Sequence, residues 1–437
     1  MENLGKRKLK FDYSWITYAL CFLCSCVSLG FCSTGRTYYL TAITDALDFS
    51  RGDYSWTETI RYGVSTILNL YLGFFISKFG IKKLLCAGFV CLIGFAYTGS
   101  VASELWQFYL GAVLLGIGLA WTSTAMMSAV VGIWCKKNKG TITGIILFAN
   151  GLGGAVAVQI ISPIIFDPNN QPFGYRNSYQ LVTIILAVVL LLIILFFKEK
   201  PKGAEDTEIV VGKKSKKARG VGWVGMEYDQ AKKKPYFYLA IIAIFLTGIS
   251  LNGIGNVSAP HLYDLGFEKQ FVANIGTVTN LCLMGTKIAT GFLYDRKGIK
   301  VTMNICFICA FVSLGGLILL DNSDAGKVLA YVRGIAGTIA LPLETVMISI
   351  FASEMFGDKS FIKVLGIFSA ANYAGLALGS PFVNTCYDLF NHSYNVSFAV
   401  LAAFMIVAMV TMNFVIRAAH KDKKLILAAL SQAEQQA

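Results

Sequence analysis

Six ionisable side chains stand inside segments that are otherwise apolar, and they are the residues most able to do chemistry. The acids are Glu344, well inside its segment, and Glu58, near a boundary. The bases are Arg36, Arg61, Lys287 and Arg333. A cation at the centre of a bilayer costs about 2.5 to 3.5 kcal/mol, so these groups must face water or a partner. The excess of positive charge predicts a site that attracts and holds an anion.

Lys287 is the first candidate for that site. It precedes Asp295, in the loop that follows, by about 12 Å along a helix. At that depth its ammonium group does not reach the lipid headgroups easily. The sequence therefore predicts that Lys287 binds the anion, with a pairing to another helix as the alternative.

Arg36 is the second candidate. A guanidinium can hold a carboxylate through two parallel hydrogen bonds, and Tyr38 could add a hydroxyl donor. The alternative is an arginine at the outer interface that reaches for headgroups. Arg61 has a local explanation, because Glu58 lies three residues earlier on the same helix face. We expect this pair to have a structural or gating role.

Glu344 and two asparagines are uncharged or easily neutralised groups within the apolar segments. Glu344 follows Pro342, where a protonated carboxyl costs less than a charged one. It could carry a coupled proton or act as counter-ion to Lys287 or another cation. Asn150 and Asn372 either hold helices together or contact the ligand.

Other kinds of chemistry find little support. An enzyme would need clustered catalytic groups, whereas the three histidines are scattered, at His261, His392 and His420. The spacing of Cys21, Cys24 and Cys26 fits no zinc motif, so we expect no metal. The glycines of residues 151–154 lie inside an apolar run instead of following a strand, which excludes a dinucleotide loop and leaves no cofactor predicted.

Membrane-spanning helices must position these residues. Hydrophobic residues make up 55% of the 437 residues and charged residues 14%, with a mean hydropathy of +0.61. A bilayer needs about 20 apolar residues per helix, and the runs are continuous instead of alternating, which excludes a β-barrel. We predict an all-α membrane protein whose twelve transmembrane helices cover residues 14–40, 54–77, 83–102, 105–133, 140–165, 178–197, 236–263, 270–294, 299–320, 326–353, 362–387 and 394–417.

The chain contains two copies of one unit. Residues 291–300, GFLYDRKGIK, recur in weaker form at residues 73–82, GFFISKFGIK, 218 positions earlier. A second pattern around Asn150 returns around Asn372 at an offset of 222. Six spans return the chain to the same side, so the two six-helix bundles are parallel repeats related by a pseudo-two-fold axis along the membrane normal. Such repeats enclose a cavity that opens to each side in turn.

The repeat also divides the chain into parts. We predict an N-terminal bundle at residues 1–197, a cytoplasmic linker at 198–235, a C-terminal bundle at 236–419 and a cytoplasmic tail at 420–437. Arg333 has Leu115 as its counterpart 218 positions earlier. This difference between the copies predicts that the two halves have different roles.

The basic residues fix the orientation. With the N-terminus inside, about 30 of the 38 Lys and Arg residues lie in intracellular segments and four in outer loops, as the positive-inside rule requires. We therefore expect a multi-pass protein of the cell membrane with both termini cytoplasmic. The net charge of +13 then reports topology and lipid contact, and does not indicate a nucleic-acid partner.

The loop at residues 291–300 resembles the signature loop between the second and third helices of each half in the major facilitator superfamily. The resemblance implies gating roles for Gly291, Asp295, Arg296 and Gly298, and for the matching residues of the first copy, Gly73, Ser77, Lys78 and Gly80. Ser77 stands where the family has Asp, so the ion-pair latch of the first copy is in doubt.

Within that superfamily, short motifs are similar to those of monocarboxylate transporters and oxalate:formate antiporters. They are Ser55-Trp56, residues 174–176, residues 227–232 and Lys287 itself, which in that group binds the substrate carboxylate. Two features depart from the group: Leu283 replaces an Asp one turn before the basic residue, and the lysine that antiporters carry in the eleventh span is missing near Asn372. These departures leave proton symport unsecured and count against a dicarboxylate.

The resemblance implies a monomeric secondary active transporter that moves a small organic anion, a monocarboxylate, by alternating access, through proton symport or anion exchange. Arg333 matches a basic position of the superfamily and joins the expected substrate-binding residues. A carrier of another small solute, such as an amino acid, dicarboxylate or sugar phosphate, remains an alternative. A transporter-like sensor and a membrane-embedded enzyme are further alternatives.

Overall fold

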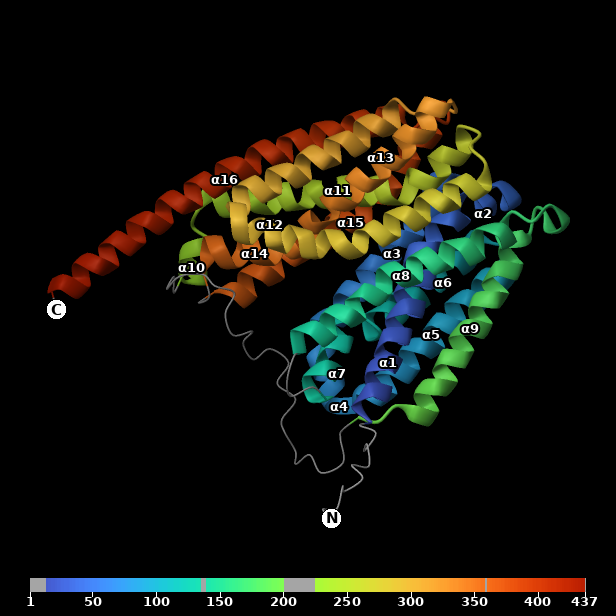
Figure 1. Cartoon of the computed structure of the whole chain (residues 1–437), viewed down its shortest axis with the longest axis horizontal. Helices are drawn as coiled ribbons and strands as arrows, with labels where there is room; N and C mark the ends of the chain where they lie inside the picture. The colour runs from blue at the N-terminus through green and yellow to red at the C-terminus, as the bar shows by residue number, and fades with distance from the viewer. Residues whose placement is uncertain (1–12, 135–138, 200–224, 358–359, 437) are drawn as a thin grey trace, which may run out of the picture.

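A computed structural model describes residues 13–134, 139–199, 225–357 and 360–436, and every regular element in these residues is helical. The helices form two bundles, one from each half of the chain (Figure 1). The first half contains α1 Ser14–Ser25, η1 Cys26–Thr34, η2 Gly35–Tyr38, α2 Tyr39–Leu47, α3 Arg51–Leu70, α4 Leu72–Phe79, α5 Ile81–Val101, α6 Leu105–Trp121, α7 Thr124–Trp134, α8 Lys139–Ile165, η3 Pro168–Asn170 and α9 Gly174–Phe196. The second half contains α10 Tyr228–Ala231, α11 Pro235–Asp264, α12 Lys269–Ile318, α13 Asp324–Ala340, η4 Leu341–Glu344, α14 Val346–Phe356, α15 Phe361–Leu389 and α16 Asn395–Gln436.

Each of the twelve predicted spans has a helical counterpart. Several spans consist of two or more elements, such as the first, which runs from α1 to α2. Helix α12 instead carries two spans, which turn at Gly298 with φ 76° and ψ 172°. Its counterpart Gly80, between α4 and α5, has φ 80° and ψ 160°. The same backbone conformation, which favours glycine, therefore recurs in both copies of the loop.

The most polar spans lie where the two halves meet. Within the described residues, eight helical segments are long and apolar enough to cross a membrane, or nine if the bent pair of Asp324–Glu344 and Val346–Phe356 counts as one. Three predicted spans are absent from this set, namely those formed by α3, by the first part of α12 and by α15. Helix α3 packs on α15, and α12 packs on α8 across the interface. These helices lack apolar character because they face protein and cavity more than lipid.

Glycines allow close packing at equivalent positions of the two bundles. A Cβ atom on Gly153 of α8 would collide with the backbone carbonyl of Cys26, and one on Gly375 of α15 would collide with that of Phe245. Each of these glycines thus brings the fifth span of its half against the first span. The 222-residue offset in the sequence therefore corresponds to a repeated helix contact.

The bundles meet at one end and diverge toward the other. They converge near α2 and separate toward α4 and α7 in one half and α10 and α14 in the other (Figure 1). At the convergent end, the hydrophobic core of the first half continues into residues of the second, including Leu262, Phe267 and Val272. At the divergent end, Gly144, Gly291 and Gly366 face open space. The two bundles are therefore packed together at the α2 end and separate on the side of the α4–α5 loop (Figure 1).

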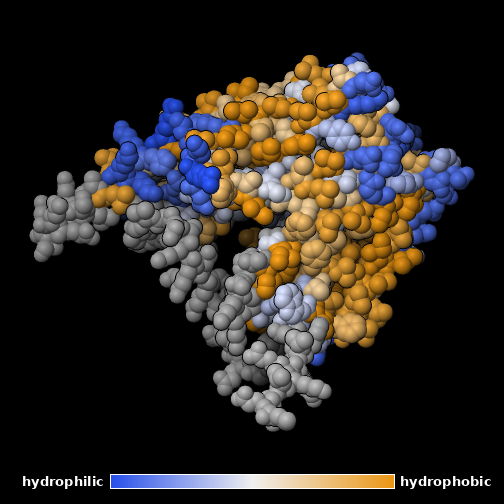
Figure 2. Space-filling model, viewed as in Figure 1, coloured by the Kyte–Doolittle hydropathy of each residue, from blue (hydrophilic) through white to orange (hydrophobic). Residues whose placement is uncertain are grey.

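The surface agrees with a membrane setting. Hydrophobic residues cover much of the visible face between hydrophilic residues at opposite ends (Figure 2). Residues 1–12 and 200–224, which include most of the predicted linker, lie outside the described residues. The predicted boundary between bundle and tail at residue 419 falls within α16, which continues unbroken to Gln436.

Candidate functional site

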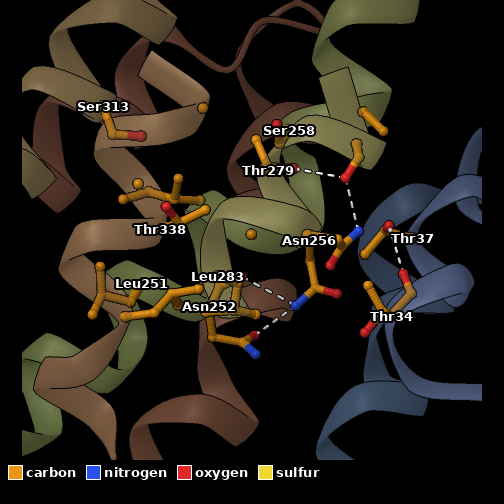
Figure 3. Close-up of a pocket in the computed structure, with 18 of the residues that line it drawn as sticks. Thr34, Thr37, Leu251, Asn252, Asn256, Ser258, Thr279, Leu283, Ser313 and Thr338 are labelled. Carbon is orange, nitrogen blue, oxygen red and sulfur yellow. Dashed lines mark hydrogen bonds between the residues drawn. The ribbon is translucent and has the colours of Figure 1, made fainter. Parts of the chain in front are cut away.

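A cavity of about 330 Å³ lies between the two bundles. Its volume is at the lower end of the range for small-molecule sites. Thr34 and Thr37 of the first half lie on one side and Asn256 of α11 faces them, with Ser313 and Thr338 farther into the second half (Figure 3). Most lining residues belong to the second half. The site is therefore asymmetric although the fold is a repeat.

Irregular helical segments supply part of the cavity wall. The first span changes to a π-helix at Cys26–Thr34 and then to a 3-10 helix at Gly35–Tyr38, and both segments contribute lining residues. The tenth span breaks at the 3-10 segment Leu341–Glu344, which ends on Glu344 in the wall. Departures from α-helical geometry often mark functional positions. Here they direct polar side chains of two spans toward the cavity.

Two arginines of the first half share one glutamate. Arg36 forms an ion pair with Glu58 and donates a hydrogen bond to Thr57 Oγ1 at 3.2 Å. Arg61 contacts the other carboxylate oxygen of Glu58 through Nε at 2.9 Å and Nη2 at 2.5 Å. All three charged side chains are at least nine-tenths buried. The i, i+3 pair expected from the sequence is thus extended by Arg36, which is not among the lining residues, whereas Arg61 is.

Arg333 has a different environment in the second half. It is 3% exposed and lines the cavity. One guanidinium nitrogen donates a hydrogen bond to Ser258 of α11, and the buried Nε has no hydrogen-bond partner among the described residues. No carboxylate of the described residues forms an ion pair with it. Arg333 is therefore a buried cation without a described counter-ion at a cavity wall.

The remaining predicted residues are placed as follows. Tyr38 and Glu344 line the cavity. The Asn372 amide donates to the Glu344 carbonyl at 3.1 Å, so it supports the break in the tenth span without lining the cavity. Asn150 is half-buried in α8 and is not among the described lining residues. Lys287 belongs to α12, but its side chain lies outside what the structure describes.

Sequence reasoning missed the polar residues of α11 and the neighbouring spans. Asn256 donates to the carbonyl and side-chain oxygens of Asn252 at 3.1 and 2.9 Å (Figure 3). Asn252 in turn donates to the Tyr62 hydroxyl across the interface at 3.1 Å. Asn280 and Ser313 also line the cavity. The i, i+4 spacing of Asn252 and Asn256 within an apolar run is a signal that could have identified this face.

The convergent end is closed by contacts between the halves. Arg51 at the start of α3 forms a bidentate ion pair with Asp264 at the end of α11, at 2.5 and 2.8 Å. It also donates to the Tyr394 hydroxyl at 3.0 Å. The ammonium of Lys269 lies 4.4 Å from the centroid of the Phe166 ring. Access to the cavity from this end is therefore blocked by charged and aromatic side chains.

The two signature loops differ in their contacts. In the first copy, the Ser77 hydroxyl donates to the Phe74 carbonyl at 2.8 Å. The Lys82 amide beside Gly80 donates to Glu199 at 2.9 Å, which ties this loop to the end of the sixth span. In the second copy, Arg296 stacks over the Phe292 ring at 4.3 Å. The second loop instead contacts a carboxylate through the Tyr294 side chain, which is hydrogen-bonded to Glu354.

Comparison with known proteins identifies the fold. The family model described as Major Facilitator Superfamily matches residues 19–350. The agnestins efflux protein AgnL12 of Paecilomyces divaricatus is 23% identical over 388 residues, 81% of this chain and 82% of that protein. The sialic acid transporter NanX of Escherichia coli (strain K12) is 22% identical over 277 residues, 62% of each. A bacterial homolog of the human lysosomal transporter Spinster, in an inward-facing and unoccupied conformation, has a TM-score of 0.74 at 14% identity and covers 94% of this chain and 98% of that one.

Proposed function

The chain belongs to the major facilitator superfamily, and on this premise we propose that it is a secondary active transporter for a small organic anion, a monocarboxylate. The observation that carries the proposal is Arg333, a buried cation that lines the cavity without a described counter-ion. A charged hydrogen bond to a carboxylate would repay part of the cost of burying that guanidinium. A neutral solute would leave the charge uncompensated.

Two further cations can add to this attraction. The cluster of Arg36, Glu58 and Arg61 has two positive charges and one negative charge, and Arg61 reaches the cavity wall. Lys287 follows the lining residue Leu283 by one helical turn, and we propose that it also contacts the anion. Their combined field raises the local concentration of anions in the cavity. Tyr38 supplies a hydroxyl donor from the opposite half.

The mechanism we propose is alternating access. The positive-inside rule assigns the divergent end to the cytoplasm, so the described conformation is open to the inside and the Arg51–Asp264 pair closes the outside. Rocking of one bundle against the other breaks this pair and brings the loops of Gly73 and Gly291 together. The carrier works as a monomer in the cell membrane, with both termini cytoplasmic.

Coupling is assigned to Glu344. It lies at the break of the tenth span, in the same cavity as Arg333. Protonation there neutralises an acid whose charge is costly inside the membrane. We therefore propose proton symport, with anion exchange as the mode that remains when Glu344 cannot titrate. Asn372 stabilises the break in the tenth span through its hydrogen bond to the Glu344 carbonyl. Asn150 contributes to the packing of the fifth span.

Uptake into proteoliposomes tests the proposal. The purified chain is assayed with radiolabelled lactate, gluconate and glucuronate, and with neutral glucose. We expect uptake of at least one acid, a loss of about 100-fold in Arg333→Gln, equivalent to roughly 3 kcal/mol, and partial activity in Arg333→Lys. Arg176→Gln, which removes an arginine outside the cavity lining, should behave as the wild type. Uptake of glucose above every acid, or full activity of Arg333→Gln, contradicts the proposal.

A further inference from the structure

Resting on the proposed function, we infer that the substrate is a hydroxylated monocarboxylic acid, with its carboxylate on Arg333 and one of its hydroxyl groups on Ser313. The cavity wall carries this inference. Of the 28 residues that line it, 15 have a hydroxyl, amide, carboxyl or guanidinium group. These polar groups come from both halves of the chain. The wall can therefore form hydrogen bonds with a ligand at several points.

Ser313 provides the most specific evidence. Its side chain is 1% exposed and lines the cavity, and its Oγ has no hydrogen-bond partner among the described residues. Hydroxyls inside helices commonly bond to a carbonyl of the preceding turn, as Thr279 and Thr338 of this wall do at 2.9 and 2.8 Å. A buried hydroxyl without such a bond is costly. Ser313 is therefore available to a ligand.

Ser313 and Arg333 belong to the same wall. Gly337 lies one helical turn after Arg333, and a Cβ atom built on it would lie 3.0 Å from the Ser313 Oγ. The Cβ atom of Arg333 in turn packs against Gly316, on the helix that carries Ser313. Gly337 leaves the space beside Ser313 free of a side chain. The guanidinium and the free hydroxyl can thus contact two groups of one small molecule.

The amides on the facing helix extend this pattern. Asn256, Asn252 and Tyr62 form a chain of hydrogen bonds that fixes the orientation of both amide groups. Amides and hydroxyls donate and accept, as the hydroxyls of a ligand do. An aliphatic tail would displace water from these groups without replacing its hydrogen bonds, and polar sites reject ligands on that ground. The wall therefore favours a hydroxylated chain over a hydrocarbon chain.

The volume sets the size of the ligand. A volume of 330 Å³ is at the lower end of the range for small-molecule sites, so the ligand is a small molecule. A six-carbon acid with several hydroxyl groups belongs to this size class. Hydroxylated acids of about this size, such as aldonic and uronic acids, are therefore the expected ligands.

Binding to the full-length chain in detergent tests this inference through ligand-induced thermal stabilisation. The probes are gluconate and glucuronate as hydroxylated acids, hexanoate as a hydrocarbon acid of equal chain length, and sorbitol as a neutral polyol. We expect at least one hydroxylated acid to bind tenfold or more tightly than hexanoate. Ser313→Ala should weaken that binding about five- to tenfold and leave hexanoate unchanged. Ser25→Ala, which removes another buried unpaired serine hydroxyl away from the cavity lining, is the matched control.

The outcomes separate this inference from the proposed function. If no hydroxylated acid binds more tightly than hexanoate, or if Ser313→Ala and Ser25→Ala behave alike, the hydroxyl assignment is overturned. Binding of hexanoate that requires Arg333 would then leave the anion carrier intact. If sorbitol binds as tightly as gluconate and Arg333→Gln binds both normally, the anion carrier fails instead.

Discussion

The two halves of this protein treat their buried arginines in opposite ways. In the first half, Arg36 and Arg61 share Glu58, which leaves one net positive charge in a closely bonded cluster. In the second half, Arg333 lines the cavity and has only Ser258 as a described hydrogen-bond partner. A buried ion pair is costly to break, because breaking it leaves a buried charge without a counter-ion. The contrast therefore distinguishes a cluster that stabilises the fold from an arginine whose charge a ligand can compensate.

The repeat shows how this asymmetry arose in the sequence. Arg333 donates its hydrogen bond to Ser258, which lies on α11, the first span of the second half. At the 218-residue offset, the counterpart of Arg333 is Leu115, which is fully buried in α6. The second half thus has a buried cation at a position where the first half has a leucine. The chemistry of the cavity is divided between the copies instead of being duplicated.

The largest effect is expected from Glu58→Gln. This change leaves Arg36 and Arg61 buried without their counter-ion, and it should lower the free energy of unfolding by about 3 to 5 kcal/mol. Thermal unfolding in detergent measures the loss. Arg36→Gln is the control, because Glu58 then keeps Arg61, and it should cost less. A Glu58→Gln variant as stable as the wild type would remove the distinction between the two halves.

Glu344→Gln tests whether the two intramembrane acids have different roles. Glu58 is held by two arginines, whereas Glu344 lines the cavity and is the proposed proton carrier. A gradient of one pH unit can drive about tenfold accumulation, and we expect this accumulation to disappear in the variant while exchange of labelled for unlabelled anion persists. Both are measured in proteoliposomes. If accumulation survives, another group couples the proton.

The two signature loops should respond differently to the same substitution. Gly80 and Gly298 both combine a positive φ with an extended ψ, so alanine at either costs about 1 to 3 kcal/mol. At Gly80 the new Cβ would also meet the Glu199 carboxylate, whereas at Gly298 it meets open space. We expect Gly80→Ala to lower the thermal unfolding midpoint more than Gly298→Ala. Equal shifts would show that the Glu199 contact adds nothing.

The smallest effect on stability is expected from Arg333→Gln. Because the variant removes a buried charge without a described counter-ion, the free energy of unfolding should change by less than about 1 kcal/mol or should rise slightly. The same thermal assay should show that stabilisation by the anion is lost. A fall in stability comparable with that of Glu58→Gln would mean that Arg333 holds structure as well.

Much of the fold could be predicted from local patterns. Continuous apolar runs indicate spans, and the recurrence of residues 73–82 at 291–300 indicates the repeat, which the shared conformation of Gly80 and Gly298 reflects. The site could be predicted only in part. Arg333, Tyr38 and Glu344 line the cavity, whereas Arg36 is held by Glu58, and Asn150 and Asn372 are not among the lining residues. The substrate-binding and coupling roles of all six residues stay predictions.

Sequence patterns alone indicate a two-copy, twelve-span membrane protein that resembles the major facilitator superfamily and has excess positive charge in its interior. Which of those charges is neutralised depends on how the helices pack. The deciding contacts join different helices, such as Arg36 with Glu58 and Arg333 with Ser258. The spacing of residues along one helix fixes which side chains share a face, but it does not fix which neighbouring helix that face meets. Packing of the spans sets these partners, and with them the difference between a structural arginine and a binding one.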